Sequence, residues 1–256
     1  MRAVTTRVGA ILGAAIALAG LVGSPAAAAP DLASSDALAH CPPMIALGVD
    51  GTLKVGKETS TVHPILERLA ARGARTIRID YPGEISPLGT HTYDGSKELG
   101  VAELHRQVAR AHTECPGAAV RIVGFSQGAA VAGDVLADLA RAVDRPADLA
   151  GLLIADPRTS GTGAEVVVPA ALPGISPTGA RAGFGDVPVA TVCAAGDAVC
   201  DMVDPLADPA GAAGRIEGYF ALHQHYSTLV VDGVPFVDVM VALVEHPRTT
   251  EVRIVP

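Results

Sequence analysis

Short apolar runs alternate along this chain with longer segments of helical periodicity. Five of the runs are rich in valine, leucine, isoleucine and alanine and carry few polar positions. Such runs are typical of strands that are buried on both faces of a parallel sheet. They predict strands over Met44–Val49, Thr76–Ile79, Val120–Val123, Leu152–Ala155 and Val187–Cys193.

The segments between these runs predict helices that cross from one strand to the next. In one of them, Val101, Leu104, Val108 and Ala111 fall on a single helical face. Strands that alternate with helices in this way indicate an α/β fold with a mostly parallel sheet. The predicted helices cover Val62–Ala71, Lys97–His112, Gly128–Val143 and Phe236–Glu245, the last of which is expected to close the chain.

The stretch over residues 157–186 interrupts this alternation. It is rich in glycine, proline, serine and threonine and contains one apolar patch, Val166–Leu172. A long irregular stretch inside a compact domain is usually either functional or a solvated excursion of the surface. The sequence leaves both interpretations open.

The N-terminal segment predicts export. Arg2 and Arg7 precede an uncharged run, Val8–Val22, and small residues follow it up to Ala29. This is the pattern of a cleaved signal peptide, because a membrane span needs about 20 apolar residues and this run is shorter and broken by glycines. An uncleaved anchor is the alternative. We expect a signal peptide over residues 1–28, a linker over 29–40 and one secreted domain over 41–256, in the cell envelope or the medium.

The negative net charge of the chain limits the classes of partner that it is expected to bind. The formal net charge is −8 and falls to −10 without the two positive charges of Arg2 and Arg7. Nucleic acids and anionic membrane surfaces repel an acidic protein. Neither is therefore expected to be its main partner.

All four cysteines lie after the predicted signal peptide. An even number of cysteines in an exported protein predicts disulfides, here two. Of the three pairings, Cys193 with Cys200 closes a short loop, which leaves Cys41 with Cys115. A zinc site is the alternative, but the sequence lacks the paired C-x-x-C spacing of such sites.

A candidate nucleophile lies in the motif Gly124-Phe125-Ser126-Gln127-Gly128. The G-x-S-x-G pattern alone is weak evidence in a chain with 28 glycines. Here, however, it follows a predicted strand directly and leads into an alanine-rich predicted helix, which is the order of a nucleophile elbow. The turn projects the serine beside the helix N-terminus, whose dipole favours a developing oxyanion. Ser126 is the candidate nucleophile, and a plain Gly-Ser turn is the alternative.

A nucleophilic serine needs a histidine that takes its proton and a carboxylate that orients this histidine. With an elbow of this kind both follow the serine in chain order. His223, His225 and His246 follow Ser126. His246 lies beside a proline and is expected at the surface, so the choice is between His223 and His225. On one side of a strand these two would instead suit a metal, although no third ligand is clustered with them.

Asp197 is the first candidate for the carboxylate. It follows a predicted strand and lies within the loop that the Cys193–Cys200 disulfide would close. Asp156, directly after another predicted strand, is the second candidate. Asp201 and Asp204 are expected to be solvated or capping residues.

At this point the motifs resemble the cutinase family. The segment from Cys193 to Cys200 is similar to the C-x-x-G-D-x-[VI]-C signature, in which the catalytic aspartate lies inside a disulfide loop. Cys115 matches the disulfide cysteine ahead of the family's G-[YF]-S-Q-G elbow. The similarity runs from about Cys41 to Val244. It implies an α/β-hydrolase fold, a three-layer sandwich around a mostly parallel sheet, with two disulfides.

Two tripeptides also resemble the related PE-PPE serine-hydrolase domain, namely Tyr81-Pro82-Gly83 and Thr92-Tyr93-Asp94. The cutinase resemblance assigns site residues. It implies Ser126 as nucleophile, Asp197 as acid and His223, the first histidine of an H-x-x-Y segment, as base.

The resemblance further implies an oxyanion hole made by the backbone amide of Gln127 and by Thr52. Thr52 lies where the family has R-G-[ST]-x-E, a motif that reads Val49-Asp50-Gly51-Thr52-Leu53 here. The interval between Cys200 and His223 is longer than in the family pattern, which predicts an insertion over Pro205–Gly218.

Together these features predict a secreted serine esterase that cleaves lipid or polyester ester bonds through an acyl-enzyme. It is expected to need no cofactor and no metal, and to act as a monomer in transient contact with a lipid or polymer surface. The patch Val166–Leu172 would dock an acyl chain. The alternative is an exported cell-envelope protein that keeps the fold without turnover, because a fold does not guarantee its chemistry.

Overall fold

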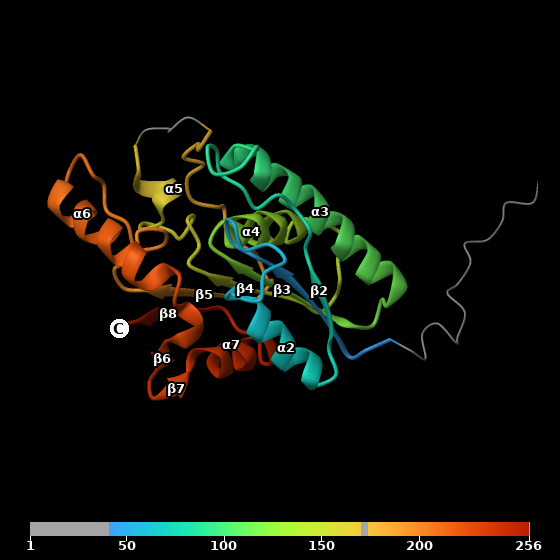
Figure 1. Cartoon of the computed structure of the whole chain (residues 1–256). Coiled ribbons are helices and arrows are strands. Elements are labelled where there is room, and N and C mark those ends of the chain that lie inside the picture. Colours follow the sequence, from blue (N-terminus) through green and yellow to red (C-terminus); the bar gives the residue numbers. More distant parts are fainter. Residues whose placement is uncertain (1–40, 170–173, 256) are drawn as a thin grey trace, which may run out of the picture. The chain divides into compact units, whose positions relative to one another are not determined.

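The computed structural model describes residues 41–169 and 174–255 (Figure 1). The predicted signal peptide, the predicted linker and Leu172 of the apolar patch therefore lie outside the described residues. In the part of the chain that is described, no helix combines the length and the hydropathy that a membrane crossing requires.

A six-stranded sheet forms the centre of the described domain, in the order β2-β1-β3-β4-β5-β8. Every neighbouring pair in it is parallel. The carboxyl ends of all six strands therefore lie at one edge of the sheet, where α/β folds place their sites. The strands are β1 (Met44–Val49), β2 (Arg75–Arg78), β3 (Ala119–Phe125), β4 (Leu149–Ile154), β5 (Val189–Ala194) and β8 (Thr250–Ile254).

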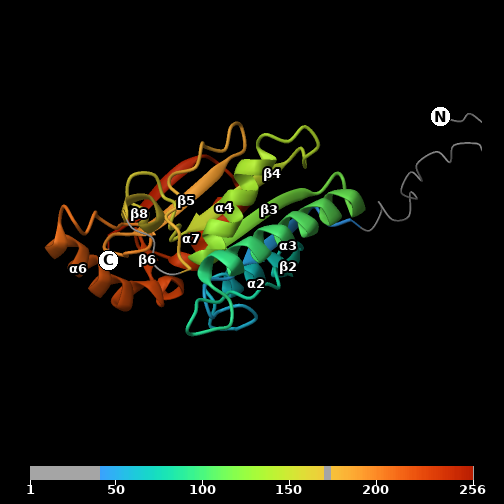
Figure 2. The ribbon, with the colours of Figure 1, turned by 90° about the horizontal axis from the view of Figure 1, so that it is seen from above.

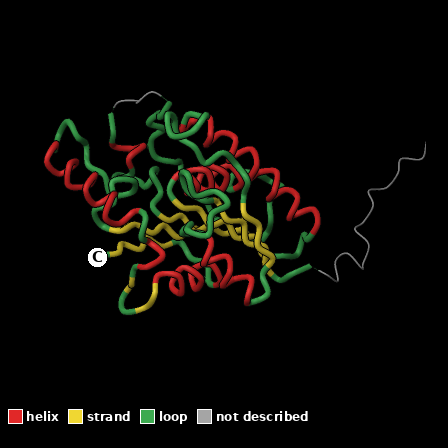
Figure 3. The backbone as a smooth tube through the Cα atoms, in the orientation of Figure 1, coloured by secondary structure: helices red, strands yellow, loops and turns green. Residues whose placement is uncertain are grey.

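Helices cover both faces of this sheet, as Figures 1 to 3 show. Helices α3 (Tyr93–Glu114) and α4 (Gln127–Leu139) pack on one face and share a core with Ile45 and Leu47 of β1. Helices α2 (His63–Ala71) and α7 (Phe236–Glu245) pack on the other face, where Ala46 lies. This alternation along β1 follows from the two-residue period of a strand. The expected three-layer α/β sandwich is confirmed.

The five predicted strands and four predicted helices are all present, with ends that differ by a few residues. The expectation that Phe236–Glu245 closes the chain is wrong, because β8 follows it and pairs with β5. The predicted insertion contains a helix, α6 (Pro209–Gly218), which the Asp208 side chain caps by accepting the Gly211 N–H. The remaining elements are short: α5 (Ala164–Val167), a π-helical turn (Tyr219–His223), a 3-10 turn (Tyr226–Thr228) and the hairpin β6 (Val230–Val231) with β7 (Val234–Pro235).

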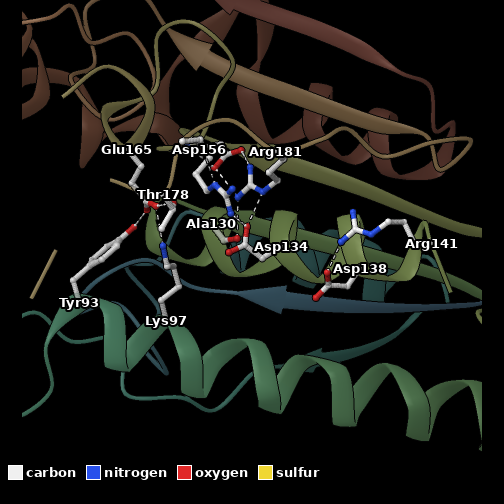
Figure 4. A network of polar contacts seen from close by, with 12 residues as sticks. Tyr93, Lys97, Ala130, Asp134, Asp138, Arg141, Asp156, Glu165, Thr178 and Arg181 are labelled. Atoms are coloured by element: carbon white, nitrogen blue, oxygen red, sulfur yellow. Dashed lines mark hydrogen bonds and ion pairs between the residues drawn. The ribbon is translucent and has the colours of Figure 1, made fainter. Parts of the chain in front are cut away.

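Ion pairs fasten the stretch 157–186 to the helices α3 and α4. Lys97 of α3 donates to Glu165 of α5 at 2.8 Å, and both side chains are buried. Arg181 donates to Asp134 of α4 at 2.8 Å (Figure 4). The stretch is therefore anchored at two places by groups that face the domain, which excludes the interpretation as a solvated excursion for these residues.

Both predicted disulfides are present. Cys41 bonds Cys115 and thereby joins the segment before β1 to the end of α3. Cys193 bonds Cys200 and closes the loop that follows β5. Asp197 lies inside this short loop.

Candidate active site

Ser126 lies in a tight, strained turn between β3 and α4. Its φ of 58° is in the left-handed region, which is costly for a residue with a side chain. Only small neighbours permit this geometry. A Cβ at Gly124 would overlap the Gly128 carbonyl oxygen, and a Cβ at Gly128 would overlap the Val49 carbonyl oxygen. The predicted strand, turn and helix are thus all present around the serine.

A chain of hydrogen bonds links Ser126 to His223 and Asp197. The Nε2 atom of His223 lies 2.9 Å from the Ser126 Oγ, and its Nδ1 atom lies 2.8 Å from the Asp197 Oδ2. The exposed fraction is 8% for Ser126, 2% for His223 and 0% for Asp197. The structure therefore brings together the three residues that the resemblance selects, which lie 97 and 26 positions apart in the sequence.

Two aromatic rings stack on the imidazole of His223. The Phe125 ring centroid lies 4.8 Å from that of His223, and the Tyr219 centroid lies 4.7 Å from it. Tyr219 and His223 are the first and last residues of the π-helical turn that leads on from α6. The turn that directly follows the predicted insertion therefore carries both the histidine and one of the rings that stack on it.

Three donors of the protein converge on the carboxylate of Asp197. Its Oδ1 accepts the Val199 N–H at 3.0 Å, within the disulfide loop. Its Oδ2 accepts the Tyr226 hydroxyl at 2.9 Å in addition to the His223 contact. Burial, together with the negative charge of Asp197, raises the pKa of Tyr226 well above its ordinary value. Tyr226 is a contact of the site that sequence reasoning missed, although it is the tyrosine of the H-x-x-Y segment.

Asp201 is not the solvated residue that the sequence suggested. It is buried, and its Oδ2 accepts the Gly196 N–H at 2.7 Å. It also pairs with Arg215 of α6 and Arg253 of β8, each at 3.0 Å. Asp201 thus ties the loop around Asp197 to two elements that the sequence did not predict. Asp204 accepts the Leu206 N–H at 2.8 Å within a turn, whereas the cap of the following helix α6 is Asp208.

The loop after β1 lies against Ser126, as an oxyanion hole requires. A Cβ at Gly51 would lie 3.0 Å from the Ser126 Cβ, so Gly51 passes close to the serine. Thr52 directly follows Gly51 in the chain. The carbonyl oxygen of Asp50 accepts the Tyr81 hydroxyl at 2.5 Å. The Asp50 carboxylate is buried and pairs with Arg78 at 2.6 Å. These contacts hold the loop in place, and no sequence motif predicts them.

Gln127 begins helix α4, and its side chain is clamped on both sides. Its Oε1 accepts the Ser96 hydroxyl at 3.0 Å and its Nε2 donates to the Glu84 carbonyl oxygen at 3.0 Å. The first backbone N–H groups of a helix have no acceptor within the helix. The side-chain contacts hold Gln127 in place, and its backbone N–H, directly after Ser126, is available to an oxyanion.

The other candidates lie apart from this constellation. Asp156 pairs with Arg181 instead of a histidine (Figure 4), and burial raises its pKa against the opposing effect of that guanidinium. His225 and His246 are exposed. The strand that would have put His223 and His225 on one side is absent, because His223 ends a π-helical turn. Within 41–169 and 174–255, no three His, Cys, Asp or Glu side chains are grouped to hold a metal.

Comparisons with known proteins agree with this geometry. The family model described as Cutinase matches residues 40–213, which is more than half of the chain. The Carboxylesterase Culp6 homolog of Corynebacterium glutamicum is 32% identical over 197 residues, which cover 66% of this chain and 64% of that relative. The match thus spans less than two thirds of the relative's length.

Among solved structures, an iodinated complex of acetyl xylan esterase superposes with a TM-score of 0.52 and 21% identity. The match covers 81% of this chain and 99% of that chain, and supports the fold. With the family model spanning most of the domain that holds the Ser126 elbow and the Asp197 loop, the chain belongs to the cutinase family.

Proposed function

We propose that this chain is a secreted serine esterase that hydrolyses carboxylic esters through an acyl-enzyme on Ser126. The observation that carries the proposal is the continuous hydrogen-bond chain from Ser126 through His223 to Asp197. Membership of the cutinase family supports the same reaction class, as do the two relatives whose names describe them as esterases.

In the acylation step, the Ser126 Oγ attacks the acyl carbon while its proton passes to the His223 Nε2. Asp197 orients the ring through Nδ1 and stabilises the imidazolium that forms. The carbonyl oxygen becomes an oxyanion, which the amide of Gln127 and a donor of Thr52 stabilise. When the ester C–O bond breaks, His223 returns the proton to the leaving alcohol. Ser126 then carries the acyl group.

Deacylation repeats these steps with water as the nucleophile. His223 takes a proton from the water, whose oxygen attacks the acyl carbon, and the Ser126 Oγ leaves as a hydroxyl with that proton. The products are one carboxylic acid and one alcohol for each ester and water consumed. This sequence requires no metal and no cofactor.

Apolar esters of the lipid or polyester type are the proposed substrates. Leu53, next to Thr52, is 40% exposed, and Phe220, in the turn that ends at His223, is 71% exposed. Exposed apolar side chains beside a site favour an apolar ligand or surface. We propose that the enzyme acts as a monomer in transient contact with such a surface. Export is supported by the four cysteines, which all lie in disulfides and thus suit an oxidising compartment.

Hydrolysis of p-nitrophenyl esters tests the proposal. We expect Ser126→Ala to lower kcat at least about 10³-fold, because the nucleophile is lost while binding is kept. Ser160→Ala, which removes the hydroxyl of an exposed serine, is the matched control and should retain wild-type turnover. A series of acyl chains from acetyl upward would then define the substrate class.

Two results would contradict the proposal. Turnover that survives Ser126→Ala would exclude the acyl-enzyme on this serine. Loss of turnover in the presence of a chelator would point to a metal-dependent reaction instead.

A further inference from the structure

The hydroxyl of Tyr226 is a buried polar group to which the proposed reaction gives no role. It lies 2.9 Å from the Asp197 Oδ2, the same oxygen that lies 2.8 Å from the His223 Nδ1. The Ala194 N–H donates to the phenol oxygen at 2.8 Å. Tyr226 has no exposed surface, so no water competes for these contacts.

The direction of the Tyr226 proton follows from its neighbours. The Ala194 amide is a donor and can only occupy a lone pair of the phenol oxygen. Two acceptors remain, namely the Asp197 carboxylate at 2.9 Å and the disulfide sulfur of Cys200 at 3.5 Å. A charged oxygen is the stronger acceptor. The hydroxyl therefore donates to Asp197, and the raised pKa of Tyr226 keeps it protonated.

Packing holds the phenol ring in this position. The ring meets Phe125 and Phe236 edge-on, with centroid distances of 5.6 Å and 5.7 Å. Tyr226 lies only three residues after His223 in the chain. One short segment thus supplies the histidine and a second donor to the carboxylate that orients it.

We propose that Tyr226 is a positioning residue, whose hydroxyl holds the Asp197 carboxylate and withdraws part of the charge that faces His223. The inference rests on the proposed function of the Ser126, His223 and Asp197 constellation. The other ionisable groups around this carboxylate are Tyr219, whose pKa the burial of its ring and then Asp197 raise, and Asp201. Asp201 is itself paired with Arg215 and Arg253.

Removal of the hydroxyl has a defined electrostatic sign. Without it, the Asp197 Oδ2 keeps more negative charge and binds the imidazolium of the free enzyme more strongly. Protons then inhibit the enzyme at higher pH than before. The carboxylate also loses one of its anchors, so His223 is oriented less well during proton transfer. Binding of the substrate is not involved, because Tyr226 is fully buried.

The first test is Tyr226→Phe, which keeps the ring and removes only the hydroxyl. We expect kcat to fall about tenfold, KM to change less than about twofold, and the acidic limb of the kcat/KM profile to move up by about half a pH unit. Phe236→Leu is the matched control. It loosens the same ring cluster and should lower Tm without moving the acidic limb.

A second variant keeps the inference testable if Tyr226→Phe folds poorly after the Ala194 N–H loses its acceptor. Site-specific 3-fluorotyrosine at position 226 retains the hydroxyl and makes it a stronger donor, so the acidic limb should move to lower pH. An unchanged limb in a folded Tyr226→Phe enzyme, or in the fluorotyrosine enzyme, would overturn the inference. If Ser126→Ala abolishes turnover in the same assay, that failure concerns Tyr226 alone and leaves the proposed function intact.

Discussion

His223 and His225 lie two residues apart and occupy opposite environments. The imidazole of His223 is buried between partners on both nitrogens, whereas His225 is exposed and its backbone N–H closes a turn to the Leu222 carbonyl oxygen. Spacing in the sequence does not decide which of the two is the base, because both lie more than 90 positions after Ser126 and only the fold brings one of them to it. The π-helical turn decides between them, since it ends at His223 and directs that ring toward Ser126.

Alanine substitutions separate the two histidines. We expect His223→Ala to lower kcat about 10³-fold or more, because no other group takes the Ser126 proton. His225→Ala should stay within about threefold of wild type, as substitutions at exposed positions usually have small effects. Ester hydrolysis at pH 8 measures both. The reverse order of losses would move the role of base to His225.

The individual site residues differ in how well the sequence identifies them. Ser126 follows from the small residues that its left-handed turn requires, and Asp197 from the cysteines on either side of it. Asp201 and Asp50 could not be found in this way, because their roles depend on partners far away in the sequence, Arg253 and Arg78. Tyr226 stands in the H-x-x-Y segment, but that motif does not reveal its contact with Asp197. A buried ion pair or hydrogen bond leaves no local pattern of spacing.

One disulfide and two secondary-structure elements, α6 and β8, hold the loop that carries Asp197. The Cys193–Cys200 disulfide closes it, Arg215 of α6 and Arg253 of β8 pair with its Asp201, and α6 ends against it. A Cβ at Gly218 would overlap the carbonyl oxygen of Gly196, so this contact between helix and loop is direct. Helix α6 therefore supports the loop that carries Asp197 and leads directly into the turn that ends at His223.

The two disulfides should contribute differently to activity and to stability. The double change Cys193→Ala and Cys200→Ala loosens the loop around Asp197, and we expect kcat to fall about tenfold while the protein stays folded. The pair Cys41→Ala and Cys115→Ala opens a loop of 74 residues, so chain entropy predicts a loss of about 4 kcal/mol in the free energy of unfolding with little change in kcat. Urea titration and ester hydrolysis measure the two effects. Equal losses of both quantities in both variants would refute this division.

The interior elements were easier to predict than those at the periphery. Strands β1, β3 and β4 have helices on both faces, so their sequences are continuous apolar runs. Strand β8 lies at the sheet edge and has only two apolar residues among its five, Val252 and Ile254, which is a weaker signal. Helix α6 buries only Ala212 among its ten residues, so it has no apolar stripe to detect.

Across the whole described domain, buried tyrosines occur in the cores on both faces of the sheet and beside the site. Tyr81 packs against α3, Tyr93 is the first residue of that helix, and Tyr226 belongs to the core on the opposite face of the sheet. All three side chains are buried. Burial raises the pKa of each, with further contributions from Asp50 at Tyr81, Glu165 at Tyr93 and Asp197 at Tyr226. The folded state therefore holds these three phenolic protons more tightly than the unfolded chain does.

This arrangement predicts a loss of stability at alkaline pH. Because the folded pKa values are raised, the contribution of the tyrosines is intact below the unfolded value of about 10 and declines above it. These three buried groups alone give a slope of about −4 kcal/mol per pH unit once the unfolded tyrosines ionise. The raised pKa of Tyr219 makes the slope steeper. Urea titrations at pH 8, 10 and 11 measure the slope. Tyr81→Phe should reduce it by about a third, and a free energy of unfolding that is constant up to pH 11 would contradict the prediction.

The place of β8 in the chain decides when the ion pairs around the Asp197 loop can be completed. Of the described elements this strand is the last to be translated, and it carries the Arg253 that pairs with Asp201. Ser126, Asp197 and His223 are all synthesised before Arg253 is added to the chain. The loop that carries Asp197 therefore lacks one of its ion pairs until β8 has been made and has paired with β5. The surroundings of Asp197 are thus completed only by the last of the described strands.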